Sequence, residues 1–273
     1  MAADTGPDPL LRPPGYALVW SDEFDREGAP DPAKWTFERG FVRNGEMQWY
    51  QPDNARVADG RLIIEGRRER KPNPQFGSPT LKPPFRERKS INFTSASLST
   101  KGLQSWTYGR FEIRAKLVAE QGLWPALWFV GTDGRWPACG EIDLMEFYQG
   151  HILANFAWAS RVPGHPVWNS VRIPVAELAG NPGWDEKFHI WTMDWDERRI
   201  SLGLDGREIN RLDLAKVRNR EAPGGINPFH KPQYLIMNLA LGSAKGGPLR
   251  DTQLPSRFEV DYVRVYQRKG AIR

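Results

Sequence analysis

The chain has 273 residues, 40% hydrophobic and 26% charged, which is ordinary for a globular protein with enough apolar material for a core. No apolar run approaches the about 18 residues that cross a membrane, and the single cysteine, Cys139, excludes an intramolecular disulfide. The formal net charge is +5, but the basic residues cluster only at residues 67–71 and 86–89, which we interpret as solvated loop charge rather than a nucleic-acid site.

The first sixteen residues are rich in Pro and small side chains. We expect a tail over residues 1–16, followed by one domain over residues 17–273. Two turn signals, Asp59-Gly60 and Asp205-Gly206, adjoin alternating runs and predict tight turns or hairpins. Residues 66–92 hold many Pro and basic residues and predict a long irregular loop, a feature that often forms a functional wall or lid.

Alternation of apolar and polar residues predicts strands along much of the chain. It is clear in GRFEIRAKLV at residues 109–118 and in FEVDYVRVYQ at residues 258–267. Helical periodicity is limited to short candidates at residues 175–178 and 212–218. We therefore expect an all-β fold of many antiparallel strands in two packed sheets, in which the twelve Trp residues fill the core or form platforms for sugar rings.

Three acidic residues interrupt the apolar run CGEIDLMEFY. In a regular strand, Glu141 and Asp143 share one face and Glu146 lies on the other. A β-bulge at residues 144–145 would absorb one extra position and return Glu146 to the face of the other two. With such a bulge, the spacing of two and then three residues would place a row of carboxylates on one surface.

Such a row is costly, because neighbouring like charges resist joint ionisation. Two carboxyl groups about 5–5.5 Å apart match a retaining glycosidase, in which one attacks the sugar and the other protonates the leaving oxygen, while a third acid tunes their charge. Two other interpretations remain open at this stage: a site for a hard cation, and an exposed strand with solvated acids.

The flanking sequence resembles glycoside hydrolase family 16, in its laminarinase-like branch, an endo-β-1,3-glucanase group. WPACGEIDLME, with WPALWF just upstream, is similar to the family's catalytic strand. Seven further segments occur in family order: LVWSDEFD, NGEMQWYQPDN, SASLSTKG, YGRFEIRAK, FHIWTMDWD, MNLALGS and VDYVRVYQ. The resemblance implies a concanavalin-like β-jelly-roll sandwich of two curved antiparallel sheets, with an open substrate cleft on the concave face.

The resemblance also implies roles for individual residues. Glu141 corresponds to the nucleophile, Asp143 to an assisting acid and Glu146 to the general acid/base. The bulged E-x-D-x-x-E spacing is that of laminarinases, agarases and carrageenases. Further residues match family positions at the cleft: Trp124, Trp136, Trp128, Asn44, Glu46 and Asn238. Of these, we expect Trp124 and Trp136 to contact sugar and Trp128 to belong to the core.

Two further features concern substrate contact and metal binding. Laminarinases commonly carry a histidine in the strand after the catalytic one, where this chain has ILANFAW and Asn155 is the nearest polar candidate for substrate contact. Glu23, the Gly60 carbonyl and Asp261 fall where many relatives hold a structural calcium ion on the convex side. The alternative for these three residues is a hydrogen-bond network at the strand ends.

We expect a retaining endo-hydrolase of β-1,3- or mixed β-1,3/1,4-glucans, with no cofactor for catalysis. Its partner would be a polysaccharide, with no nucleic acid or membrane, and the protein would be a secreted or periplasmic monomer. One alternative keeps the chemistry and changes the polymer to an agar-like or carrageenan-like galactan, because the histidine is missing and residues 66–92 are basic. The other is a glycan-binding lectin, which the presence of all three acids disfavours.

Overall fold

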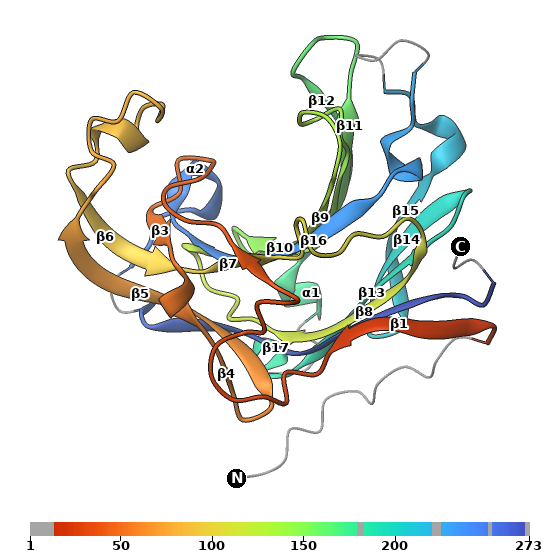
Figure 1. Cartoon of the computed structure of the whole chain (residues 1–273), viewed down its shortest axis with the longest axis horizontal. Helices are drawn as coiled ribbons and strands as arrows, with labels where there is room; N and C mark the ends of the chain where they lie inside the picture. The colour runs from red at the N-terminus through yellow and green to blue at the C-terminus, as the bar shows by residue number, and fades with distance from the viewer. Residues whose placement is uncertain (1–13, 179–182, 220–224, 251–252, 271–273) are drawn as a thin grey trace.

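The computed structural model describes residues 14–178, 183–219, 225–250 and 253–270. Most of the expected tail, residues 1–13, lies outside the described residues, and the first strand begins at Tyr16. As predicted, the described chain is built from strands in two sheets (Figure 1).

The larger sheet has ten strands, with the order β15-β14-β13-β8-β17-β5-β6-β3, while β1 pairs with β17 and β4 pairs with β5. Its strands are β1 (Tyr16–Asp22), β3 (Gln48–Tyr50), β4 (Ala55–Ala58), β5 (Arg61–Pro72), β6 (Ser90–Ser95), β8 (Gly109–Lys116), β13 (His189–Trp195), β14 (Arg199–Leu204), β15 (Arg207–Asp213) and β17 (Ser256–Arg268). All of these pairings are antiparallel except β3 with β6.

The smaller sheet has seven strands, all antiparallel, in the order β12-β11-β10-β9-β16-β7-β2. They are β2 (Thr36–Phe37), β7 (Ser97–Ser99), β9 (Leu123–Gly131), β10 (Glu141–Tyr148), β11 (His151–Ala159), β12 (Pro166–Pro174) and β16 (Gln233–Leu241). In Figure 1, β5 and β6 rise at one end and β11 and β12 at the other, with β9, β10 and β16 at the bottom of the U between them.

Helical segments are short. The segments with described bounds are α1 (Val175–Leu178), α2 (Ser243–Gly246) and 3-10 turns at Pro52–Asn54, Phe85–Glu87, Trp184–Glu186, Leu214–Lys216 and Pro228–His230. The helix expected at residues 175–178 is confirmed. The one expected at 212–218 is wrong: β15 continues to Asp213, whose carboxylate accepts a hydrogen bond from the Ala215 amide and starts a 3-10 turn instead.

The sheets pack through alternating apolar residues, as the sequence pattern indicates. In β8, Phe111 and Ile113 are fully buried in the shared core, whereas Arg110 and Arg114 point away and form ion pairs. Both turn signals close hairpins, and both residues of each dipeptide have the positive φ that such turns require. Among the described residues, no helix is long and apolar enough to cross a membrane.

The irregular loop expected over residues 66–92 is shorter than predicted. Strand β5 continues to Pro72 and pairs with β6, which starts at Ser90, so only residues 73–89 are irregular. A register shift between Arg68 and Lys71 breaks the alternation, which explains why the sequence pattern hides the end of this strand. The remaining loop packs on a small separate core of Phe41, Phe85 and Ile91.

Candidate active site

Strand β10 contains the bulge that the acid spacing and the resemblance of its flanks predict. Asp143 lies opposite Asn155 of β11 and Glu146 opposite Leu153, so three steps on β10 match two on its partner. A register shift also occurs between β10 and β9. The two residues in the bulge, at positions 144 and 145, are both completely buried in the core between the sheets. The extra residue is therefore taken up on the core side, and Glu146 returns to the face of Glu141 and Asp143.

The three acids line a cleft of ≈ 690 Å³. The strand registers arrange much of its floor in three rows that run across the sheet, and we name each row after its acid. From β16 through β9, β10 and β11 to β12, the Glu141 row is Tyr234, Val130, Glu141, Ala157 and Trp168; the Asp143 row is Ile236, Trp128, Asp143, Asn155 and Ser170; the Glu146 row is Asn238, Ala126, Glu146, Leu153 and Arg172. All of these residues except Ala157 line the cleft.

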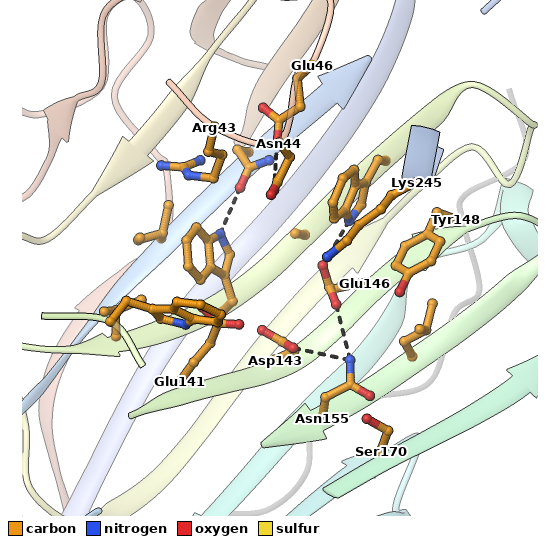
Figure 2. A pocket seen from close by; sticks show the side chains of 18 of the residues that line it. Arg43, Asn44, Glu46, Glu141, Asp143, Glu146, Tyr148, Asn155, Ser170 and Lys245 are labelled. Carbon is orange, nitrogen blue, oxygen red and sulfur yellow. Dashed lines mark hydrogen bonds between the residues drawn. The ribbon is translucent and has the colours of Figure 1, made fainter. Parts of the chain in front are cut away.

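Neighbouring side chains hold the acids in place (Figure 2). The Asn155 amide donates to Asp143 Oδ2 at 3.1 Å and to Glu146 Oε2 at 3.2 Å. The Trp124 indole N–H donates to Glu146 Oε1 at 2.8 Å. Lys245 of α2 lies over the same end of the cleft, with its ammonium group 5.8 Å from the Trp124 ring centroid. Glu146 is therefore fixed by two donors and faces a cation.

Burial and mutual repulsion raise the pKa of every acid in the cluster. Burial, followed by the Glu146 charge, raises the pKa of Glu141 to about 7. The pKa of Asp143 lies well above its usual value because the group is buried beside two other carboxyl groups. Burial also raises the pKa of Glu146, although the Trp124 N–H and the Lys245 charge oppose the shift. The cluster therefore retains a proton near neutral pH, so one carboxyl can donate while another attacks.

The three expected Trp residues all line the cleft, in different ways. Trp136 is 45% exposed and offers a ring face to solvent beside Glu141, whose pKa its indole N–H lowers. Trp124 is buried and acts on Glu146 through its N–H rather than by an open face. Trp128, expected in the core, is instead half-buried on the cleft floor, because it occupies the same face of β9 as Trp124.

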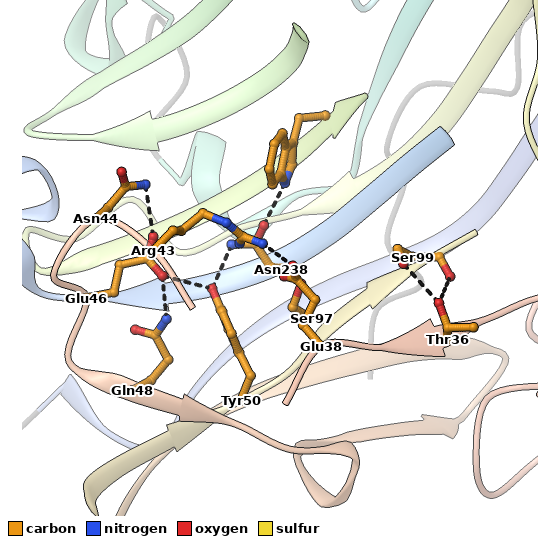
Figure 3. A network of polar contacts seen from close by, with 11 residues as sticks. Thr36, Glu38, Arg43, Asn44, Glu46, Gln48, Tyr50, Ser97, Ser99 and Asn238 are labelled. Atoms are coloured by element: carbon orange, nitrogen blue, oxygen red, sulfur yellow. Dashed lines mark hydrogen bonds and ion pairs between the residues drawn. The ribbon is translucent and has the colours of Figure 1, made fainter. Parts of the chain in front are cut away.

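A polar network forms the cleft edge nearest to β16 (Figure 3). Asn44 donates to Glu46 Oε1 at 3.2 Å, and the Tyr50 hydroxyl donates to Glu46 Oε2 at 3.4 Å. Asn238 in turn donates to the Tyr50 oxygen at 3.1 Å and accepts from the Trp128 indole at 2.8 Å. Three residues expected at the cleft, Asn44, Glu46 and Asn238, thus belong to one connected set that continues to Trp128.

The loop at residues 73–89 supports this edge from behind. The Arg88 guanidinium donates to the Glu46 carbonyl at 2.5 Å and to the Gly45 carbonyl at 2.9 Å. Its carbon centre also lies 4.6 Å from the Phe41 ring centroid and 5.0 Å from that of Phe85. Part of the basic charge noted in the sequence is therefore structural, since it fixes the backbone of the turn that carries Asn44.

Sequence reasoning missed several cleft residues. The cleft is also lined by Glu38, Arg43, Tyr148, Trp168, Ser170, Arg172, Tyr234 and Lys245. Arg43 forms an ion pair with Glu38 and lies 5.0 Å from the Trp128 ring centroid. The alternation of Trp168, Ser170 and Arg172 was a usable signal, but only the pairing of β12 with β11 shows that this face continues the acid rows.

The residues expected to hold calcium do not fit that role. The Glu23 carboxylate accepts three hydrogen bonds from Arg264, the shortest at 2.7 Å, and Asp261 accepts from Arg114 at 2.8 Å. Each negative charge is thus paired with an arginine. Across the described ranges, no group of three or more His, Cys, Asp and Glu side chains could hold a metal ion. The arrangement consists instead of two ion pairs, and only Glu23, just after β1, lies at a strand end, whereas Asp261 lies within β17.

Comparison with known proteins shows extensive similarity. Residues 84–264 match the family described as glycosyl hydrolases family 16. A β-glucanase of Rhodothermus marinus is 36% identical over 279 aligned residues, which cover 96% of this chain and 89% of the relative. The similarity therefore extends over nearly the whole of both proteins.

Two solved structures are similar over almost their full length. One belongs to work on endo-acting O-glycanases that prominent members of the human gut microbiota express to initiate mucin breakdown; it is 32% identical, with a TM-score of 0.84 over 96% of this chain and 94% of that chain. The other is the catalytic domain of an endo-1,3-β-glucanase (laminarinase) from Thermotoga petrophila, 34% identical, with a TM-score of 0.76 over 93% and 99% of the two chains.

Proposed function

Because the chain belongs to glycosyl hydrolases family 16, we propose that its cleft is the active site of a retaining endo-hydrolase that cleaves β-1,3- or mixed β-1,3/1,4-glucans. The observation that carries this proposal is the bulged strand β10, which brings three carboxyl groups with raised pKa values to one cleft. Members of the family need no cofactor for catalysis.

The reaction proceeds by double displacement. Ionised Glu141 attacks the anomeric carbon while protonated Glu146 gives its proton to the departing glycosidic oxygen, which leaves a covalent glycosyl-enzyme and an ionised Glu146. Glu146 then takes a proton from an incoming water molecule, whose oxygen attacks the anomeric carbon and releases Glu141. Both carboxyl groups return to their starting charge, and the anomeric configuration is retained after two inversions.

Two neighbours support this exchange. Asp143 lies between the glutamates in the row order and has a pKa well above its usual value, so we infer that it donates a hydrogen bond to Glu146 and limits the total charge of the cluster. Asn155 donates to Asp143 and Glu146 and keeps both carboxyl groups oriented through the cycle. This amide stands where the resemblance leads one to expect a histidine, so the cluster here is held by a neutral donor that does not titrate.

Substrate binding uses both edges of the floor. We assign sugar stacking to the exposed face of Trp136 and to Trp128 on the floor. Asn44, Glu46 and Asn238 provide donors and acceptors for sugar hydroxyl groups at the opposite edge. Because one chain supplies all the residues that line the cleft, we propose that the protein acts as a monomer. A polysaccharide is too large to enter a cell intact, so we propose that the enzyme is secreted or periplasmic.

A second candidate substrate has specific support. The O-glycanase structure superposes with a TM-score of 0.84, above the 0.76 of the laminarinase domain, at nearly equal sequence identity. The same catalytic cluster would then cut within an O-linked glycan or a galactan rather than a glucan. This candidate changes the polymer and leaves the roles of the carboxyl groups as proposed.

Product analysis tests both candidates. Laminarin, barley mixed-linkage glucan, agarose, carrageenan and mucin are incubated with the protein and with Glu141→Gln, and released oligosaccharides are separated by size. We expect products from the glucans that disappear in the variant. Release from mucin or a galactan alone would transfer the function to the second candidate. A Glu141→Gln protein with full activity would refute the proposed mechanism for either polymer.

A further inference from the structure

Strand β12, the outer edge of the smaller sheet, presents three side chains that the proposed chemistry does not use. Trp168, Ser170 and Arg172 alternate along the strand and line the cleft, and each continues one acid row. Figure 2 shows Ser170 beside Asn155, on the far side of the acids from Arg43. Neighbouring strands lie about 4.8 Å apart, so β12 is roughly 10 Å from β10. A substrate that crosses the acids and continues over β11 would place its next sugar unit on β12.

The aromatic part of this edge has the geometry of a sugar platform. Trp168 is 41% exposed and Trp136 is 45% exposed, and their ring centroids lie 6.4 Å apart with planes inclined by 50°. The two indoles thus form an open V rather than a closed stack. Large aromatic faces that remain exposed in a cleft are suited to stacking on the apolar face of a pyranose ring. Trp136 serves the position beside Glu141, and Trp168 extends the platform outward.

The cationic part is Arg172, whose charge is unmatched. Several other strand arginines pair with a carboxylate on an adjacent strand, as Arg110 does with Asp194 at 2.7 Å. Arg172 is exposed and lies opposite the apolar Leu153. Among the described residues its side chain forms no ion pair or hydrogen bond, and its charge lowers the pKa of the nearby Tyr148 phenol. A guanidinium group directed into a substrate cleft without an acidic partner is available to a ligand.

The other cations of the cleft are already engaged. Lys245 acts on the carboxyl cluster, where its charge lowers the pKa of Glu141 and of Glu146. Arg43 at the opposite edge forms an ion pair with Glu38. The remaining cation of the cleft lining, Arg172, lies at the β12 edge, next to the outer aromatic platform.

We propose that β12 forms a subsite for a sugar unit that carries an anionic substituent, either a sulfate ester or a carboxylate, with Trp168 stacked on the ring and Arg172 paired with the anion. The planar guanidinium matches both oxyanions with two parallel hydrogen bonds. This inference rests on the proposed function of the cleft, and it adds a preference for a charged polymer over its neutral form.

The test compares one polymer in charged and neutral forms. The kcat/KM is measured on laminarin, partly sulfated laminarin and carboxymethylated laminarin, at low and at high salt, for the wild type, Arg172→Met and Trp168→Ala. The control variant is Arg161→Met, which removes one exposed positive charge from the turn between β11 and β12, outside the cleft lining. Binding of the same polymers is measured by calorimetry in a Glu141→Gln background.

We expect the wild type and Arg161→Met to prefer an anionic form by about tenfold at low salt, which is the strength of one hydrogen-bonded charge pair. Arg172→Met should lose most or all of this preference. Trp168→Ala should lower kcat/KM on the charged and the neutral polymers alike. Preference for only one of the two anions supports the subsite and identifies its ligand.

Equal kcat/KM on charged and neutral laminarin in the wild type, or an undiminished preference in Arg172→Met, would overturn the inference while the glucanase function stands. If the wild type cuts none of these polymers, the binding arm decides separately. If the anionic polymer binds more tightly than the neutral one and Arg172→Met removes this difference, the subsite is supported although the proposed substrate fails. If charged and neutral polymers bind equally, the subsite is refuted as well.

Discussion

Replacement of Glu141 by Gln should stabilise the folded protein at alkaline pH, in addition to its effect on turnover. The pKa of Glu141 is raised from 4.5 to about 7, chiefly by burial and then by the Glu146 charge. The folded state therefore holds the Glu141 proton more tightly than the unfolded state. Between these pKa values the folded state binds more protons, so the free energy of unfolding falls as the pH rises from about 4.5 to 7 and stays low above 7.

The difference of about 2.5 pH units corresponds to roughly 3 kcal/mol of destabilisation by Glu141 above pH 7. Glutamine is neutral and nearly the same size, so Glu141→Gln escapes this cost. The contact between the carboxylate and the Trp136 N–H is already contained in this net shift, so we expect a gain of about 3 kcal/mol at pH 8. At pH 4 both states of the wild type are protonated, and the difference should be close to zero.

Urea denaturation followed by Trp fluorescence measures this directly, at pH 4 and at pH 8, for the wild type, Glu141→Gln and the exposed, cleft-remote Glu120→Gln as a control. The expected result is a higher urea midpoint for Glu141→Gln at pH 8 only, with the control unchanged at both values. A shift of equal size at the two pH values, or a less stable variant at pH 8, would refute the electrostatic reasoning.

Three other variants or treatments follow from the contacts of the site. Trp124→Phe removes the N–H that favours ionised Glu146, so the basic limb of the profile of kcat/KM against pH should move up by about one pH unit. In the control Trp128→Phe, the lost N–H donates to the Asn238 amide and not to an acid, so that limb should stay in place. The same basic limb in both variants would contradict the assignment. Arg88→Met releases two backbone carbonyls of the cleft edge, so KM should rise several-fold with little change in kcat. The control Arg86→Met, at an exposed position of the same loop, should keep the wild-type KM. A lower melting temperature of Arg88→Met without a change in KM would reduce Arg88 to a structural role. Treatment with EDTA should not change the melting temperature, because arginines neutralise the carboxylates of the expected calcium site, and a drop reversed by added calcium would contradict this.

The sequence predicts those features that depend on local chemistry. The bulge in β10 was anticipated from the acid spacing together with the resemblance of its flanks, because one extra residue on the core side brings Glu146 onto the face of Asp143. The hairpin turns follow from Asp-Gly dipeptides that adopt positive φ. A local pattern of this kind is preserved whatever the partner strands are.

The features that were missed depend on pairings distant in the chain. The calcium expectation for Glu23 and Asp261 did not anticipate the two arginines, of which Arg264 lies 241 positions away from Glu23. Trp128 was expected in the core. Both faces of β9 carry large apolar residues, and only its register with Asp143 shows which face is the cleft. Such contacts are set by topology, which the alternation of residues within one strand does not contain.

The burial of both bulge residues, Leu144 and Met145, has a consequence for how this strand tolerates insertions. Asp143 and Glu146 face positions of β11 that are two residues apart, the same separation that a regular strand without the extra residue would give. One amino acid can therefore enter or leave the strand at this point while the carboxyl groups keep their places opposite β11. Such a change adds or removes one apolar side chain in the core between the two sheets. The volume of the core and the layout of the chemistry are thus free to vary independently at the centre of the enzyme.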